Sequence, residues 1–461
     1  MSTATPAGGF VRNFPPVDLE VDLVDVRVTG QLPRQLAGTL LRIGPNPLFP
    51  VEGAHWFAGD GMVHAFHIAD GRVRYRNRWV RTRRWLDQRE TGRPLPEGLG
   101  QAADDDGLAN TNIVRHAGRL LALEEAHLPV GLQLDGLSTQ GPVDFGGQVQ
   151  GPFTAHPKVD PATSQMLFFG YGTPDWLGAG MAFGVLGADG QVERFDRFEA
   201  PYASMLHDFA ITSGHAIFPV MPLTASRTRL TAGGPAFAWE PELDCAIGVL
   251  RRDAPVGELA WWSLPACYAY HVMNAWEEEG RIHVDVMQSN APALFPLADG
   301  SPVPDAGGSR LSRWSMDTHA GDRGGQVRQT WLSELRGEFP RIDERFTGQP
   351  NRHGWFIGHT PGGAMFNRVV HLDHAHMLEA DVYALPEEDA SSEAVFVPRA
   401  PDAVEGDGWL LAVAYRGMTN KSDLLVFDAR DVASGPLACA SLPVRVPNGF
   451  HGNWLSASQE A

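Results

Sequence analysis

Residues 63–80 read VHAFHIADGRVRYRNRWV, and this stretch decides the fold class. Apolar residues predominate in Val63–Ile68 and alternate with polar residues through Val73–Val80, and Ala69-Asp70-Gly71 stands between the two segments. Two short apolar segments around an Asp-Gly pair are typical of a β-hairpin, because both turn residues tolerate the positive φ of a tight turn. The stretch therefore predicts two antiparallel strands.

The same layout of apolar segment, polar turn and apolar segment returns at residues 113–123, 184–195, 208–220 and 272–286. With 51 Gly, 35 Pro and few long helical periodicities, the chain should be mostly antiparallel sheet. Many hairpins in one domain must hide their strand edges, and radial repetition of blades is the usual solution in a chain of this length. A large sandwich or a jelly roll usually occupies fewer residues. We therefore predict an all-β fold of the β-propeller type, with residues 1–461 as a single domain and residues 1–12 flexible.

Composition excludes several classes of function. The chain has 461 residues, 43% of them hydrophobic, and its 37 Lys and Arg against 55 Asp and Glu give a net charge of −18, so nucleic acid is not an expected partner. The cysteines Cys245, Cys267 and Cys439 form no C-x-x-C pair, which argues against a disulfide framework or a Cys-ligated metal. Because the sequence contains neither a signal-peptide pattern nor an apolar stretch long enough to span a bilayer, we expect a cytoplasmic protein without a transmembrane segment.

Four histidines stand in distinctive surroundings: His156, His207, His271 and His451. The first three each open a short predicted strand, and strands of different propeller blades converge on the axis, where their side chains could meet at a metal ion. Their separations of 51, 64 and 180 residues are too long for a local metal motif. On spacing alone, four unrelated core histidines remain the alternative.

Short motifs spread along the whole sequence favour metal ligands over unrelated core histidines. They are RIGPNP at 42–47, FAGDGM at 57–62, TAHPK at 154–158, HDFAIT at 207–212, HVMNAWEE at 271–278, FVPR at 396–399, EGDG at 405–408 and FHGNW at 450–454. In this order they resemble the carotenoid cleavage oxygenase family. The resemblance implies a seven-bladed β-propeller, with loops and short helices over one face, and an axial non-haem Fe(II) held by four histidines. In this sequence those histidines are His156, His207, His271 and His451.

Four neutral imidazoles suit a first-row transition metal and leave one or two positions open for O₂. A ligating histidine usually donates its other N–H to a carboxylate, so partner glutamates are expected, although any one glutamate could instead be a solvated surface group. The resemblance points to three of them. The pairs that we expect are Glu125 with His207, Glu338 with His271 and Glu393 with His451.

The resemblance also assigns positions around the substrate. Thr111 matches a residue whose methyl group sits beside the metal and occludes one open position, and Phe57, Trp79 and Glu124 match residues that line the substrate tunnel. Stilbene-cleaving relatives carry a Tyr and a Lys where this protein has Trp79 and Glu124. Trp79 would shorten the cavity, and the Glu124 carboxylate could accept a hydrogen bond from a phenol or assist its deprotonation.

Residues 205–212, 217–222 and 239–243 look most like the lignostilbene and isoeugenol branch of the family. We therefore predict a dioxygenase that cleaves an alkene C=C bond with O₂ and without an external reductant. The expected substrate is a phenolic aromatic alkene such as isoeugenol, 4-vinylguaiacol or a stilbenoid, and one product is a benzaldehyde such as vanillin. An apocarotenoid substrate is the alternative, a non-catalytic binding propeller is the second alternative, and weak contact with a membrane surface is compatible with either substrate.

A denser group of possible ligands, HLDHAH at 371–376, competes with the four dispersed histidines. On a strand, alternate side chains point to opposite faces, so only half of this group could share one ion. We predict that it forms a solvated edge strand. His55, His64 and His67 are placed around another strand, with His64 and His67 on opposite faces, and are expected to be structural. Motifs of α/β-hydrolases and nucleotide-binding loops are missing from the sequence.

Overall fold

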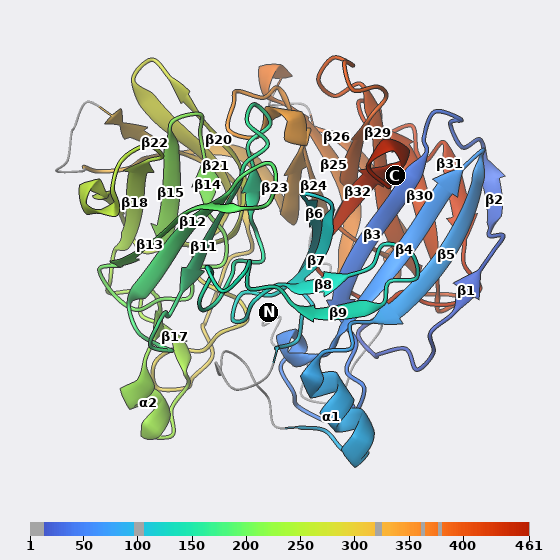
Figure 1. The fold of residues 1–461 in the computed structure, drawn as a ribbon. Helices are drawn as coiled ribbons and strands as arrows, with labels where there is room; N and C mark the ends of the chain where they lie inside the picture. The colour runs from blue at the N-terminus through green and yellow to red at the C-terminus, as the bar shows by residue number, and fades with distance from the viewer. Residues whose placement is uncertain (1–12, 96–105, 319–324, 361–364, 377–379, 461) are drawn as a thin grey trace. The chain divides into compact units, whose positions relative to one another are not determined.

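The computed structural model describes residues 13–95, 106–318, 325–360, 365–376 and 380–460 (Figure 1). The segment 1–12, predicted to be flexible, lies outside these residues. The protein divides into two compact units, which we describe separately. Among the described residues, the first unit comprises 145–351, and the second combines 13–144 with 352–460. The single domain remains a prediction, and so does the number of blades.

The first unit consists of antiparallel strands that mostly pair with their neighbours in sequence (Figure 1). One sheet contains β10 (Lys158–Val159), β11 (Met166–Tyr171), β12 (Gly180–Leu186) and β13 (Val192–Glu199). The next contains β14 (Ala210–Ile211), β15 (His215–Val220), β18 (Cys245–Arg251) and β19 (Ala260–Leu264). A ribbon of β16 (Leu223–Ala225) and β17 (Phe237–Trp239) flanks α2 (Arg227–Thr231). The last group contains β20 (Tyr268–Glu278), β21 (Arg281–Ser289), β22 (Arg310–Asp317) and β23 (Arg328–Ile342).

The second unit is also built from antiparallel strands. One sheet has the order β1 (Asp22–Leu23), β5 (Arg72–Trp79), β4 (Gly61–Ala69), β3 (Gly38–Pro45) and β32 (Gly452–Ser456). Another contains β6 (Asn112–His116), β7 (Arg119–Leu123), β8 (Val130–Leu132) and β9 (Thr139–Pro142). A third contains β2 (Arg27–Gly30), β31 (Ala438–Ser441), β30 (Lys421–Asp428) and β29 (Gly408–Arg416), with β27 (Ala390–Ser391) and β28 (Val395–Pro398) both paired to β29. The strands β24 (His353–His359), β25 (Phe366–Asp373) and β26 (Asp381–Ala384) are consecutive neighbours.

Helices are short and few among the described residues. They are α1 (Arg83–Thr91), α2, α3 (Ala457–Glu460) and the 3₁₀ turns η1 (Trp56–Ala58), η2 (Val256–Glu258), η4 (Glu344–Phe346) and η5 (His374–His376). None of the helices in the described ranges has the length and apolar character needed to cross a membrane. The all-β prediction is confirmed.

The predicted hairpin at residues 63–80 is present as β4 and β5. Ala69 faces Arg72 across a two-residue turn in which Asp70 has φ 52° and Gly71 has φ 73°. Positive φ at both central residues matches the right-handed twist of the strands that the turn joins. The β6–β7 hairpin uses the same geometry with Ala117 and Gly118, at φ 47° and 79°.

Aromatic packing in the first unit fixes the segment that follows His207. Phe209 is fully buried, and its ring centroid lies 5.1 Å from that of Phe169 and 6.0 Å from that of Phe218. Phe218 in turn packs edge-on against Phe183. Burying a side chain of this size contributes about 1.5–3 kcal/mol, so the backbone just beyond His207 is held firmly in the core.

The prediction of a solvated edge strand at residues 371–376 is wrong. β25 lies between β24 and β26, and the sequence leaves the strand at His374, where η5 begins. His371 is buried, its Nε2 lies 3.0 Å from Nδ1 of His353, and its ring stacks on Trp355. The alternation of side chains along β25 predicts its two faces, but it cannot show that β26 pairs with its second edge.

This buried histidine pair predicts a loss of stability in acid. Burial lowers the pKa of His371 to about 4, with the nearby His353 acting in the same direction, and burial also lowers the pKa of His353. Because an unfolded histidine titrates near 6.5, the unfolded protein binds more protons between about pH 6.5 and pH 4. The free energy of unfolding should therefore fall as the pH falls through this window, by about 3 kcal/mol from His371. Unfolding measured against pH should show a shallower slope in His371→Gln, and an unchanged slope would contradict the assignment.

Candidate metal centre

Three histidines of the first unit converge on one small volume. His156, His207 and His271 are buried, and one ring nitrogen of each lies within 4.8 Å of those of the other two. Nε2 of His156 lies 3.0 Å from Nε2 of His207, and the three ring centroids are 4.5–5.3 Å apart. Side chains 51 and 64 residues apart in sequence thus present nitrogens to one small volume.

The backbone around each of these histidines is irregular. His156 precedes β10, and its backbone N–H donates to the Thr154 hydroxyl at 2.9 Å. His207 precedes the two-residue strand β14. His271 lies inside β20, where the pairing with β21 shifts register on both sides of Val272. Such bulges are common beside functional sites because they turn a side chain away from the regular pleat.

The predicted partner of His271 is in place. Nδ1 of His271 lies 2.6 Å from Oε2 of Glu338, which also accepts the backbone N–H of Phe339 at 2.9 Å. The other carboxylate oxygen of Glu338 accepts the Ser309 hydroxyl at 2.9 Å. A carboxylate on Nδ1 fixes the proton there and leaves Nε2 as the basic nitrogen, which is the tautomer that a metal requires.

His451 has the same arrangement in the second unit. Its Nδ1 lies 2.9 Å from Oε1 of Glu393, and Oε2 of Glu393 accepts the N–H of Gly452 at 3.0 Å. Both side chains are buried. The backbone N–H of His451 donates to the carbonyl of Thr111 at 3.1 Å, so the predicted residue beside the metal and the predicted fourth ligand are neighbours.

Arg42 is a charged residue of this region to which the sequence assigned no role. It occupies the otherwise buried strand β3, and its guanidinium donates to the carbonyl of Pro447 at 2.9 Å. Burial lowers the pKa of Arg42 to about 10, and the charge of Glu393 opposes that shift. An arginine among buried apolar positions was the available signal, because a buried cation needs a nearby anion.

Phe57 is held close to His451 and Thr111. Its carbonyl accepts the side-chain amide of Asn110 at 2.8 Å, and its ring centroid lies 5.3 Å from that of Phe450. The Asn110 side chain also accepts the hydroxyl of Thr111 at 2.9 Å. Within the second unit, the structure thus brings together three residues that the sequence had selected separately.

Trp79 and Glu124 have defined partners of their own. The Trp79 indole donates to the carbonyl of Asn46 at 2.8 Å, and the ring packs with Met62 and Trp85 in a separate cluster. The Glu124 carboxylate contacts His127 and accepts the backbone N–H groups at residues 108 and 109, at 2.5 and 3.2 Å. Glu124 therefore holds a loop in place, and its role toward a substrate stays a prediction. Glu125 follows it half-buried, and its pairing with His207 likewise stays a prediction.

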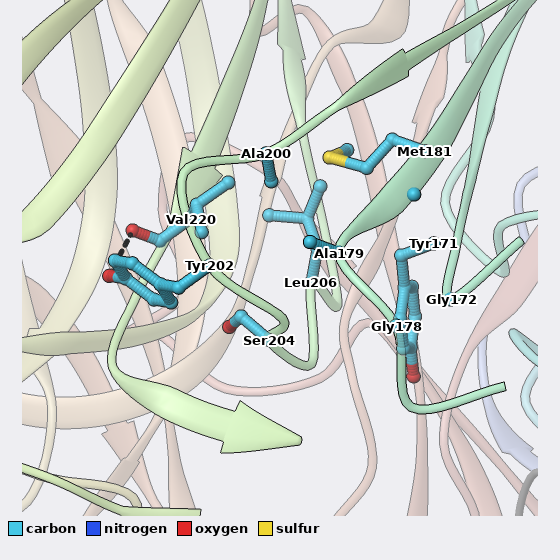
Figure 2. A pocket seen from close by; sticks show the side chains of 11 residues that line it. Tyr171, Gly172, Gly178, Ala179, Met181, Ala200, Tyr202, Ser204, Leu206 and Val220 are labelled. Carbon is cyan, nitrogen blue, oxygen red and sulfur yellow. Dashed lines mark hydrogen bonds between the residues drawn. The ribbon is translucent and has the colours of Figure 1, made fainter. Parts of the chain in front are cut away.

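A pocket whose cavity volume is only about 10 Å³, room for about one water molecule, lies in the first unit beside Leu206, the residue before His207 (Figure 2). Tyr171, Met181 and Tyr202 line it, and the Tyr202 hydroxyl donates to the carbonyl of Val220 at 3.1 Å. Sites for small molecules usually measure roughly 300–1,000 Å³. We therefore assign no substrate to this pocket.

Comparisons with known proteins agree with this geometry. The family model described as retinal pigment epithelial membrane protein (RPE65) matches residues 14–456. The protein is 37% identical to an isoeugenol monooxygenase of Pseudomonas nitroreducens, over 95% of this sequence and 96% of that one. It superposes on the crystal structure of a Pseudomonas brassicacearum lignostilbene dioxygenase with TM-score 0.91 and 34% identity, covering 99% and 98% of the two chains. A cobalt-substituted apocarotenoid oxygenase of Synechocystis gives TM-score 0.86 and 27% identity, covering 97% and 98%.

The fold and the histidines together define an all-β oxidoreductase with a group of side chains that could hold a metal ion. The protein belongs to the retinal pigment epithelial membrane protein family, the carotenoid cleavage oxygenases. The family predicted from the sequence motifs is confirmed, and so is an oxygenase activity.

Proposed function

We propose that this protein is an Fe(II)-dependent dioxygenase of the cytoplasm that cleaves the alkene C=C bond of a phenolic phenylpropenoid or stilbenoid. His156, His207, His271 and His451 would hold the ion. The observation that carries the proposal is the set of buried histidine nitrogens, with carboxylates on Nδ1 of two of the four.

The donor set fits such an ion. Neutral imidazoles leave the charge of a divalent ion uncompensated, and Glu338 and Glu393 supply negative charge at Nδ1, on the side of each imidazole away from the ligand nitrogen Nε2. Bound Fe(II) with open positions would supply the activation of O₂. Burial of the histidines keeps water away from the reacting alkene, which favours cleavage over side reactions.

The reaction balances without a reductant. One O₂ and one alkene give two carbonyl compounds, each of which keeps one oxygen atom, so both oxygens are consumed. The protein's own residues have to bind and orient the alkene. Phe57, beside Phe450 and Thr111, would present an aromatic face to a single-ring substrate.

The choice of substrate is supported by the names of the relatives, an isoeugenol monooxygenase and a lignostilbene dioxygenase. The test is a panel of isoeugenol, 4-vinylguaiacol, a hydroxystilbene and an apocarotenal, with iron content and O₂ uptake measured on the same preparation. We expect one iron per polypeptide and one O₂ consumed per aromatic alkene cleaved. Turnover of the apocarotenal alone would overturn the substrate assignment, and an iron-free protein that stays inactive after iron is added would overturn the metal assignment.

Glu124→Gln tests whether this carboxylate acts on a phenolic hydroxyl. The amide keeps the shape and one acceptor for the loop N–H groups at residues 108 and 109 but cannot take up a proton. If Glu124 assists deprotonation of the phenol, kcat/KM for a phenolic substrate should fall about tenfold more than for its O-methyl ether. Equal losses on both substrates would leave Glu124 with only its loop-holding role.

A further inference from the structure

The carboxylate of Asp208 links the segments that carry the three histidines of the first unit. Its Oδ1 lies 2.7 Å from the ammonium nitrogen of Lys158 and accepts the backbone N–H of Phe209 at 2.8 Å. Its Oδ2 accepts the backbone N–H of Val272 at 2.8 Å. Asp208 is 3% exposed, so these are contacts of a buried charge.

Asp208 and each of its partners stand within two residues of a histidine in sequence. Asp208 follows His207 directly, Val272 follows His271, and Lys158 lies two residues beyond His156. Pro157 connects His156 to Lys158 and restricts the backbone φ between them. A shift of the backbone at Asp208 or Val272 would therefore be passed directly to the adjacent histidine.

Regular strand pairing holds these segments only in part. β10 and β14 have two residues each, and β20 shifts register on both sides of Val272. In place of a continuous ladder, the Val272 N–H is satisfied by a carboxylate from another segment. Lys158 balances the charge of that carboxylate, without which a buried anion would be costly.

We propose that Asp208 and Lys158 are positioning residues that hold His156, His207 and His271 at the spacing a single metal ion requires. The proposal rests on the proposed metal site. It concerns no contact with substrate: the pair acts through the backbone, by fixing three imidazoles before the ion arrives. Preorganised ligands bind a metal more tightly because less conformational entropy is lost on binding.

The experiment is a titration of the metal-free protein with Co²⁺. Affinity is measured by competition with a chelator, and the visible absorption of the bound ion reports its coordination geometry. Asp208→Asn should weaken Co²⁺ binding about 10- to 100-fold and change the spectrum, because outer residues of metal sites have effects of this size. Lys158→Met should also weaken Co²⁺ binding. Lys158→Arg should keep most of the parent protein's Co²⁺ affinity, since arginine can also pair with the carboxylate.

A matched ion pair serves as the control. Arg252 and Asp160 of the same unit form a partly buried pair at 2.6 Å. Asp160 directly follows β10, so Asp160→Asn weakens an ion pair on the segment of His156 while it leaves the contacts of Asp208 in place. Co²⁺ affinity in Asp160→Asn should stay within about threefold of the parent protein. Wild-type affinity and spectrum in Lys158→Met and Asp208→Asn would overturn the inference, as would equal weakening by Asp160→Asn. If the parent protein binds no Co²⁺, the proposed metal site itself fails, and the inference fails with it.

Discussion

Replacement of His207 by alanine is expected to abolish stable metal binding and to lower kcat at least about a thousandfold. Its Nε2 lies 3.0 Å from Nε2 of His156, so the side chain reaches the centre of the proposed site. Removing one of few protein ligands weakens the site far more than the 10- to 100-fold typical of outer partners. Iron per polypeptide after gel filtration and O₂ uptake with the preferred alkene would measure both effects.

A second histidine of the same unit provides the control for this result. His215 is half-buried and lies 2.9 Å from Glu277, whose pKa is lowered to about 2, first by that hydrogen bond. His215→Ala makes the same change of side chain as His207→Ala and removes the contact with Glu277, but it removes no proposed metal ligand. It should keep its iron and most of its turnover. Full activity in His207→Ala, or equal metal loss in both variants, would contradict the ligand assignment.

The hairpins could be predicted from sequence because their cause is local. Asp70 and Gly71 tolerate positive φ, and the apolar residues on either side pair within a few positions of the turn. The sequence could not show how deeply a strand is covered, because coverage comes from residues far away in the sequence. His371 was misplaced for this reason, since β26 covers the edge that the pattern left open.

The same difference between local and distant causes decided which residues of the site could be predicted. Four histidines could be selected by their short motifs, but spacing alone did not distinguish ligands from core residues, and the glutamate partners came only from the family resemblance. Glu338 stands 67 residues beyond His271, in a different strand, and no local pattern connects them. Arg42 and Asp208 had no assigned role before the structure, although both lie in quoted motifs, because a buried charge becomes informative only when its partners are known.

Replacement of Glu338 by glutamine should weaken metal binding about 10- to 100-fold while the protein still folds. The carboxylate accepts from Nδ1 of His271, from the Phe339 N–H and from the Ser309 hydroxyl, so both oxygens are used. Glutamine keeps one acceptor oxygen but adds an NH₂ group that cannot accept. If that group faces His271, the imidazole must move its proton to Nε2, which removes the lone pair that would bind the ion.

Two measurements and two further variants separate this effect from a general loss of stability. Co²⁺ affinity by chelator competition should fall in Glu338→Gln, whereas the thermal unfolding midpoint of the metal-free protein should change little. Ser309→Ala removes only one hydrogen bond to the same carboxylate and should change affinity less than about threefold. Glu393→Gln should repeat the effect, because Glu393 serves Nδ1 of His451 in the same way and uses its second oxygen on the Gly452 N–H. If Glu338→Gln and Glu393→Gln both bound Co²⁺ like the parent protein, the carboxylates would not set the tautomer of the histidines, and Nε2 ligation would have to rest on the imidazole positions alone.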